Sequence, residues 1–197
     1  MTNDQAGLRE ALKVVAVALK EGEVPFALAG SYALWARGAP EPHHDVDFAV
    51  AEEDRDRVAA LLAEHGLEVA DPPEDWLLKV FVDGAMVDVL FRANGEPVTH
   101  EYLAASDEVE VESVLMPVLS ATALLLAKLS ALDERSCDLG KVIPAARAVR
   151  EQVDWPAVAE AVSDNDFAVV TLDLLGRLGV VAAGTTDQSP GRTSPVS

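Results

Sequence analysis

Short apolar runs alternate with helical segments through the first 116 residues of the chain. Four apolar residues, at positions 8, 12, 15 and 19, recur every three or four residues and predict an amphipathic helix over residues 5–20. Gly, Pro and Asp-Gly breaks then separate apolar runs that have the length of strands. We expect strands at Phe26–Ala29, His44–Val50, Leu67–Ala70, Trp76–Val82, Ala85–Phe91 and Val109–Leu115, and helices at Ser31–Ala36 and Glu53–His65.

After Ser120 the apolar residues keep to helical spacing. Leu125, Leu129 and Leu132 predict a helix that Ser120 caps. Further helices are expected over Leu139–Val149, from Asp154-Trp155-Pro156 as cap and first turn, and near Phe167–Leu178. From Gly184 onward, Thr, Ser, Pro and Gly predominate and little is left to bury, so that tail is expected to be disordered.

Together these patterns predict an α/β (α+β) protein in which a small mixed sheet is flanked by helices. The predicted divisions are an α/β core over residues 1–116, a helical C-terminal part over 117–183 and a disordered tail over 184–197. A cleft between the first two parts is the expected place for a ligand.

Composition restricts the class of protein further. The chain has 197 residues, half of them apolar, and a net charge of −19, which argues against a broad basic surface for nucleic acid. That charge still leaves room for an RNA end held at one local basic patch. The single cysteine, Cys137, excludes an internal disulfide framework. With no basic-plus-apolar leader and no apolar run that would span a bilayer, we expect a soluble cytoplasmic protein without a membrane partner.

The candidate chemistry is concentrated between Phe26 and Val50. Asp45 and Asp47 alternate with apolar residues, so a strand places both carboxylates on one face, where they repel each other unless a cation lies between them. Gly30 and Ser31 stand at a strand-to-helix junction, where free N–H groups and a hydroxyl suit a phosphate. A third carboxylate, Asp88, projects from an otherwise apolar strand.

Gly-Ser, a short helix, Asp-x-Asp and a later strand Asp, in this order, resemble the nucleotidyltransferase superfamily with the DNA polymerase β-like core. The resemblance covers about Phe26 to Phe91. A weaker likeness continues through Pro117-Val118-Leu119-Ser120 and the helix carrying Lys128. This second part is similar to the small bacterial nucleotidyltransferases of the AbiEii toxin type and, less closely, to antibiotic nucleotidyltransferases.

The resemblance implies a nucleotidyltransferase-like fold and assigns roles to six residues. Asp45 and Asp47 would coordinate Mg²⁺, while Asp88 would complete the metal site and help to deprotonate the acceptor hydroxyl. Gly30 and Ser31 would hold the triphosphate of an NTP, and Lys128 would neutralise it. In isolation each element has an ordinary structural explanation, since Asp-x-Asp often lies at a solvated edge and Gly-Ser is often a turn.

Three functions remain open at this point. The first is Mg²⁺-dependent transfer of an NMP from an NTP to a hydroxyl on tRNA, as the toxin of a toxin–antitoxin pair with an antitoxin protein as partner. The second is modification of a small antibiotic-like molecule, and the third is a degenerate core that binds or regulates without catalysis. The acidic charge favours a small-molecule or protein acceptor over RNA, whereas the likeness of the helical part favours the toxin. Trp35 and Trp76 are expected in the core, and His43 and His44 in solvent.

Overall fold

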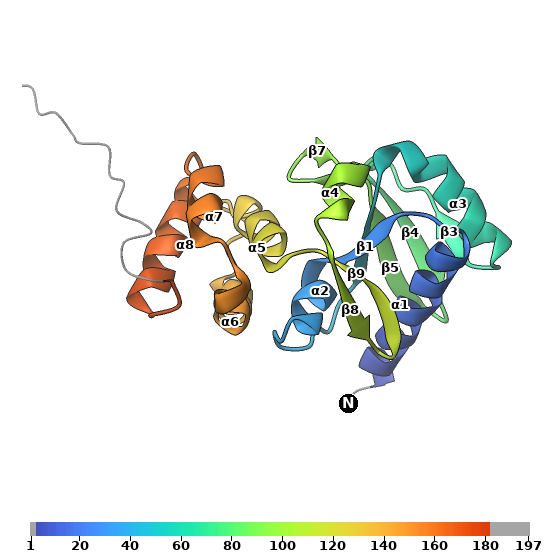
Figure 1. Ribbon diagram of the computed structural model, residues 1–197, viewed down its shortest axis with the longest axis horizontal. Coiled ribbons are helices and arrows are strands. Elements are labelled where there is room, and N and C mark those ends of the chain that lie inside the picture. The colour runs from blue at the N-terminus through green and yellow to red at the C-terminus, as the bar shows by residue number, and fades with distance from the viewer. Residues whose placement is uncertain (1–2, 182–197) are drawn as a thin grey trace, which may run out of the picture.

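The computed structural model describes residues 3–181 of the chain (Figure 1). The helices are α1 (Asn3–Glu21), α2 (Gly30–Ala36), α3 (Arg55–Glu64), α4 (His100–Ala104), α5 (Ala121–Ser130), α6 (Leu139–Val149), α7 (Trp155–Ala161) and α8 (Asp166–Arg177), with 3-10 turns at Glu52–Asp54 and Arg150–Gln152. The strands are β1 (Phe26–Ala29), β2 (Val46–Val50), β3 (Glu68–Ala70), β4 (Leu77–Val82), β5 (Ala85–Leu90), β6 (Arg92–Ala93), β7 (Glu96–Pro97), β8 (Asp107–Val111) and β9 (Val114–Val118). The expected α/β class is confirmed.

Seven strands form one mixed sheet in the order β3-β4-β5-β2-β1-β9-β8 within the described residues. β2 runs parallel to β5 and antiparallel to β1, while β1 runs parallel to β9. The short pair β6 and β7 stands apart as a small hairpin. The carboxyl end of β1 therefore lies near the middle of the sheet, where α2 begins.

The two faces of the sheet differ in character. One face carries large apolar side chains such as Phe48 and Val89, both completely buried. Helix α1 packs there, because a Cβ placed on Gly7 would contact Ala85, which shares that face. The opposite face carries small residues and charges near its centre, including Ala49 and Asp47. This asymmetry leaves space on one side of the sheet.

Helices α5–α8 pack against one another beside the sheet (Figure 1). Helix α5 is the bridge, since it contacts α2 on one side and α6, α7 and α8 on the other. The expected cap is present, with Ser120 Oγ accepting a hydrogen bond from the Ala123 N–H at 3.2 Å. Asp154 caps α7 in the same way, accepting from the Ala157 N–H at 3.1 Å. None of the helices described here is long and apolar enough to cross a membrane.

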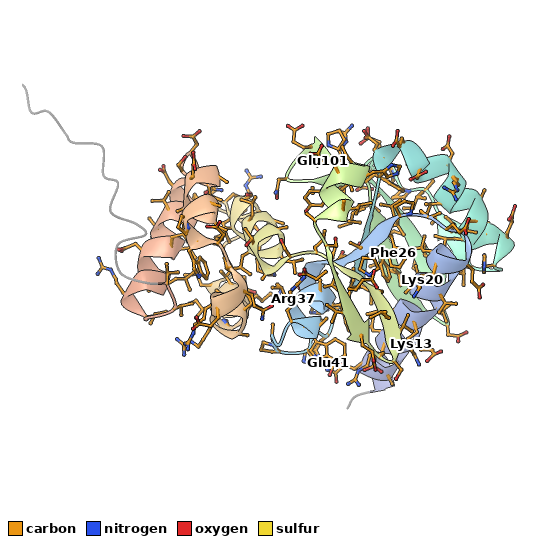
Figure 2. The ribbon with its side chains drawn as sticks, in the orientation of Figure 1. Lys13, Lys20, Phe26, Arg37, Glu41 and Glu101 are labelled. Atoms are coloured by element: carbon orange, nitrogen blue, oxygen red, sulfur yellow. The ribbon has the colours of Figure 1, made fainter. Side chains whose placement is uncertain are left out.

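Arg37 connects the end of α2 to the segment that leads from β9 into α5. Its guanidinium donates to the carbonyl oxygens of Leu119 at 2.7 Å and Val118 at 2.9 Å, and to Asp107 at 2.7 Å. Figure 2 places Arg37 on the side of the sheet part that faces the helical group. The buried guanidinium thus fixes the start of α5 relative to α2.

The structure corrects two of the expected strands. The single strand expected at Val109–Leu115 is wrong, since β8 and β9 form a hairpin that turns at Glu112 and Ser113. Both turn residues have positive φ, 48° and 66°, a conformation that the sequence Glu-Ser does not predict. The strand expected from His44 begins only at Val46, after the Pro-rich turn.

The other expected elements agree with the structure within a few residues, whereas β6, β7 and α4 were not expected from the sequence. The Asp83-Gly84 turn has positive φ at both residues, 49° and 84°, and joins β4 to β5 as predicted. Strand β9 extends to Val118, two residues beyond the proposed end of the α/β core at 116. The tail predicted over 184–197 lies outside the described residues.

Candidate active site

Asp47 and Asp88 lie opposite each other on neighbouring parallel strands. β2 pairs with β5 in a register that aligns Asp47 with Asp88, and residues aligned in this way project from the same face of the sheet. Asp45 precedes β2 by one residue and is exposed. The three aspartates therefore come from one region of the sheet, although Asp45 lies just outside the strand in which it was expected.

The Asp47 carboxylate occupies the space where Gly30 lacks a side chain. A Cβ on Gly30 would lie 1.8 Å from Asp47 Oδ2 and 2.6 Å from its Cγ, closer than any real contact. Gly30 also has φ of +59°, in the left-handed region that favours glycine. Glycine at this junction therefore allows the carboxylate to lie directly against the first turn of α2.

The Asp47 carboxylate is held in an unfavourable electrostatic position. Burial, followed by the neighbouring charges of Asp88 and Asp45, raises the pKa of Asp47 to about 7, and only Lys128 and Lys79 act in the opposite direction. In the absence of a further positive charge, this carboxylate is therefore costly to ionise. A cation beside it would remove that cost.

Lys79 is already paired with Asp88. Its Nζ lies 3.1 Å from Asp88 Oδ1, and it approaches Met86 Sδ at 3.5 Å. The sequence contains the signal for this pair, because counting back from the two-residue turn at Asp83-Gly84 places residue 79 opposite residue 88. Asp88 is thus partly neutralised, whereas no Lys, Arg or His among the described residues forms an ion pair with Asp47.

Hard divalent cations prefer carboxylate oxygens, so the chemistry of these three aspartates suits Mg²⁺. Within residues 3–181, no three His, Cys, Asp or Glu side chains are already gathered at the spacing of a metal site. The raised pKa of Asp47 is the observation that favours a cation there, since an added positive charge would stabilise the ionised form.

A cleft of about 620 Å³ opens over this region, between the sheet and α5. Asp47, Gly30 and Ser31 line it from the sheet and α2, and Lys128 lines it from α5. Burial, with Lys141 as the second cause, lowers the pKa of Lys128. Four of the six predicted site residues therefore share one cleft; Asp88 and Asp45 stand beside Asp47 rather than in the lining.

Several lining residues were not foreseen from the sequence. Trp76, expected in the core, is 41% exposed and lines the cleft instead. The β6–β7 hairpin and Tyr102 of α4 line the cleft as well. Trp76 precedes β4 rather than continuing it, so the apolar alternation that suggested a buried strand residue does not extend to this position. His43 and His44 are exposed, as expected.

Comparison with protein families identifies the chain. The model of the aminoglycoside-2''-adenylyltransferase family matches residues 11–127, which include the β1–α2 junction, all three aspartates and most of α5. The chain belongs to this family. It is a nucleotidyltransferase, and the superfamily suggested by the Gly-Ser and Asp-x-Asp pattern is confirmed.

Solved structures of other nucleotidyltransferases share the fold of this family member. The solution structure of the antibiotic-resistance factor ANT(2'')-Ia is 14% identical, with a TM-score of 0.57 over 87% of this chain and 94% of that chain. ANT(2'')-Ia in complex with adenylyl-2''-tobramycin is 14% identical, with a TM-score of 0.54 over 86% and 98%.

A nucleotidyltransferase-like protein from H. pylori is 13% identical, with a TM-score of 0.55 over 90% of this chain and 81% of that chain. No curated protein matches the sequence. The closer likeness to AbiEii-type toxins, and with it the antitoxin partner and the tRNA acceptor, stays a prediction.

Proposed function

We propose that this nucleotidyltransferase transfers the NMP group of an NTP to a hydroxyl of a small-molecule acceptor, with Mg²⁺ bound at Asp45, Asp47 and Asp88. The observation that carries the proposal is the position of the Asp47 carboxylate, pressed against Gly30, in register with Asp88 and beside the cleft that Ser31 and Lys128 line. A carboxylate pair beside a candidate phosphate site is the arrangement that phosphoryl transfer requires.

ATP is the donor that we favour. The name of the family specifies adenylyl transfer. Ser31 would donate to the triphosphate through its hydroxyl, and Lys128 would supply a positive charge from α5. Because Lys128 is buried with a lowered pKa, its ammonium ion would gain stabilisation when a phosphate enters the cleft.

In the proposed reaction, the acceptor oxygen forms a bond to the α-phosphorus while the bond to the bridging oxygen breaks and pyrophosphate leaves. The hydroxyl proton passes to a carboxylate, for which Asp88 is the candidate. Lys79, 3.1 Å from Asp88 Oδ1, would fix the orientation of that carboxylate. Bound Mg²⁺ would stabilise the charge that develops on the phosphoryl oxygens.

A small acceptor is favoured over tRNA by two independent observations. The net charge of −19 opposes the phosphate backbone of a long RNA. The family name, and the adenylyl-2''-tobramycin bound in the ANT(2'')-Ia structure, both point to small hydroxylated compounds in related proteins. We therefore place this chain with small-molecule nucleotidyltransferases.

The test is incubation with Mg²⁺ and each α-labelled NTP, together with either total tRNA or a panel of hydroxylated antibiotics. We expect label from ATP on one or more small molecules, dependence on Mg²⁺ and no label on tRNA. Asp45→Asn should abolish transfer, whereas Asp164→Asn, at an exposed turn before α8, should not. Label on tRNA alone would contradict the small-molecule acceptor and support the toxin prediction.

A further inference from the structure

Of the three proposed metal ligands, Asp45 is the one that no strand holds. Asp47 belongs to β2 and Asp88 to β5, whereas Asp45 comes just before β2 and is exposed. The segment that ends at Asp45 begins at Pro40, after the turn that follows α2, and it forms neither helix nor strand. The position of the Asp45 carboxylate therefore depends on the contacts that this segment, residues 40–45, makes with the rest of the protein.

Glu41 ties segment 40–45 to helix α1. Its two carboxylate oxygens accept hydrogen bonds from Arg9, at 2.7 Å from Nε and 2.8 Å from Nη2. None of the other side chains of the segment forms a hydrogen bond or an ion pair with a described residue. In Figure 2, Glu41 lies at the end of the sheet part from which α1 starts. A paired fork of this kind is the most directional contact that a carboxylate makes with a cation.

Arg9 is itself held in place from two further directions. The guanidinium carbon lies 5.3 Å from the centre of the Trp35 ring, and Nη1 donates to Glu112 of the β8–β9 turn at 3.3 Å. Trp35 in turn packs edge-on against the fully buried ring of Tyr32. The side chains of Arg9 and Glu41 are each only 19% exposed, so solvent screens this pair less than an ordinary surface ion pair.

Two prolines extend the effect of this contact along the backbone. Pro40 and Pro42 stand on either side of Glu41. Each ring fixes its own φ at about −65° and restricts the residue before it to extended conformations. Only two residues separate Pro42 from Asp45. When Glu41 is held, the backbone that leads to Asp45 therefore has few conformations left.

We infer that Arg9 is a positioning residue of the proposed metal site. By holding Glu41, it fixes the segment that carries Asp45. The inference rests on the proposed function, because it needs Mg²⁺ at the three aspartates. Arg9 does not line the cleft, so it acts only through the segment. Without the contact, the Asp45 carboxylate would sample more positions and would lose more conformational freedom on binding a cation, which weakens the affinity for metal.

The experiment measures Mg²⁺ binding in the full chain through the melting temperature, without nucleotide. The quantity compared is the Mg²⁺ concentration that gives half of the metal-induced rise. Arg9→Ala and Glu41→Ala should each increase it about tenfold. The double variant should show no larger increase than either single one, because both changes break the same contact. Arg9→Lys keeps the charge and loses the fork, so we expect an intermediate increase.

Glu112→Ala is the matched control. It removes the other ion pair of the same guanidinium, but Glu112 lies on the β8–β9 turn and outside the segment that carries Asp45. We expect its half-rise concentration of Mg²⁺ to equal that of wild type. The transfer assay adds a second measurement, in which the loss of rate in Arg9→Ala should be larger at low free Mg²⁺ than at saturating Mg²⁺.

Failure of this inference differs from failure of the proposed function. Wild-type Mg²⁺ affinity in Arg9→Ala and Glu41→Ala, with only a lower melting temperature in the absence of metal, would overturn the inference and leave the proposed function standing. An equal loss of affinity in Glu112→Ala would overturn it as well. If Arg9→Ala does not fold, Glu41→Ala and Arg9→Lys decide the result. A wild-type protein with neither a Mg²⁺-induced rise nor transfer would overturn the proposed function itself.

Discussion

Replacing Asp47 by Asn should stabilise the protein in the absence of metal. The pKa of Asp47 is raised from 3.8 to about 7, so the folded state holds this proton more tightly than the unfolded state does. Stability therefore falls as pH rises from about 4 to about 7, and the full loss is present above pH 7. At 1.36 kcal/mol per unit of pKa, the ionised carboxylate lowers the free energy of unfolding by about 4 kcal/mol.

An amide cannot ionise, so Asp47→Asn avoids this loss. We expect the variant to exceed wild type by about 2 to 4 kcal/mol near pH 8.5, with the gain falling to about 40% of that value near pH 5, where wild-type Asp47 keeps its proton when folded. Urea denaturation at both pH values, in the presence of a chelator, measures the difference directly. Asp164→Asn provides the control for replacing an exposed Asp.

Mg²⁺ adds a second arm to the same experiment. Saturating metal should raise the stability of wild type, by about 2.7 kcal/mol at a hundredfold excess over its dissociation constant, and should leave Asp47→Asn nearly unchanged. Equal stability of the two proteins near pH 8.5 without metal would refute the reasoning. So would a gain in the variant that does not depend on pH.

Three other predictions test the parts around this carboxylate. Gly30→Ala should abolish transfer and destabilise the fold by about 1 to 2 kcal/mol, because Asp47 fills the space that the new methyl group would need and φ at this position is positive. Retained activity would contradict the close approach of Asp47 to Gly30. Lys128→Gln should weaken ATP binding about tenfold in calorimetry with little change in melting temperature, and unchanged affinity would remove Lys128 from the phosphate site. Arg37→Ala should lower the free energy of unfolding by about 2 to 4 kcal/mol, because it leaves the Leu119 and Val118 carbonyl oxygens without the guanidinium that donates to them. Unchanged stability of this variant would show that these hydrogen bonds do not stabilise the fold.

The sequence predicts most of the fold because the local signals are strong. Apolar runs of strand length, the Asp83-Gly84 turn and the caps at Ser120 and Asp154 each fix an element through short-range chemistry. The hairpin between β8 and β9 escapes prediction because Glu112 and Ser113 adopt positive φ without glycine or asparagine. That turn is specified by the pairing of its strands and not by its own residues.

The candidate site is predictable where order along the chain determines geometry. Alternation in β2 and the pairing of β2 with β5 bring Asp47 and Asp88 together, and the sequence contains both carboxylates in recognisable contexts. The part of the cleft beside α4 is different, because Trp76, Tyr102 and the β6–β7 hairpin meet only through tertiary packing. No spacing of residues along the chain indicates that Trp76, which precedes β4, lines a cleft rather than the core.

The most direct test of the account is mass spectrometry of acceptors after incubation with wild-type protein, Mg²⁺ and ATP, repeated with Asp47→Asn. The account predicts a small molecule that gains one AMP group, release of an equal amount of pyrophosphate, and neither product from the variant even though it is at least as stable. Transfer by Asp47→Asn at the wild-type rate would contradict the account, because the carboxylate beside Gly30 would then have no part in the chemistry.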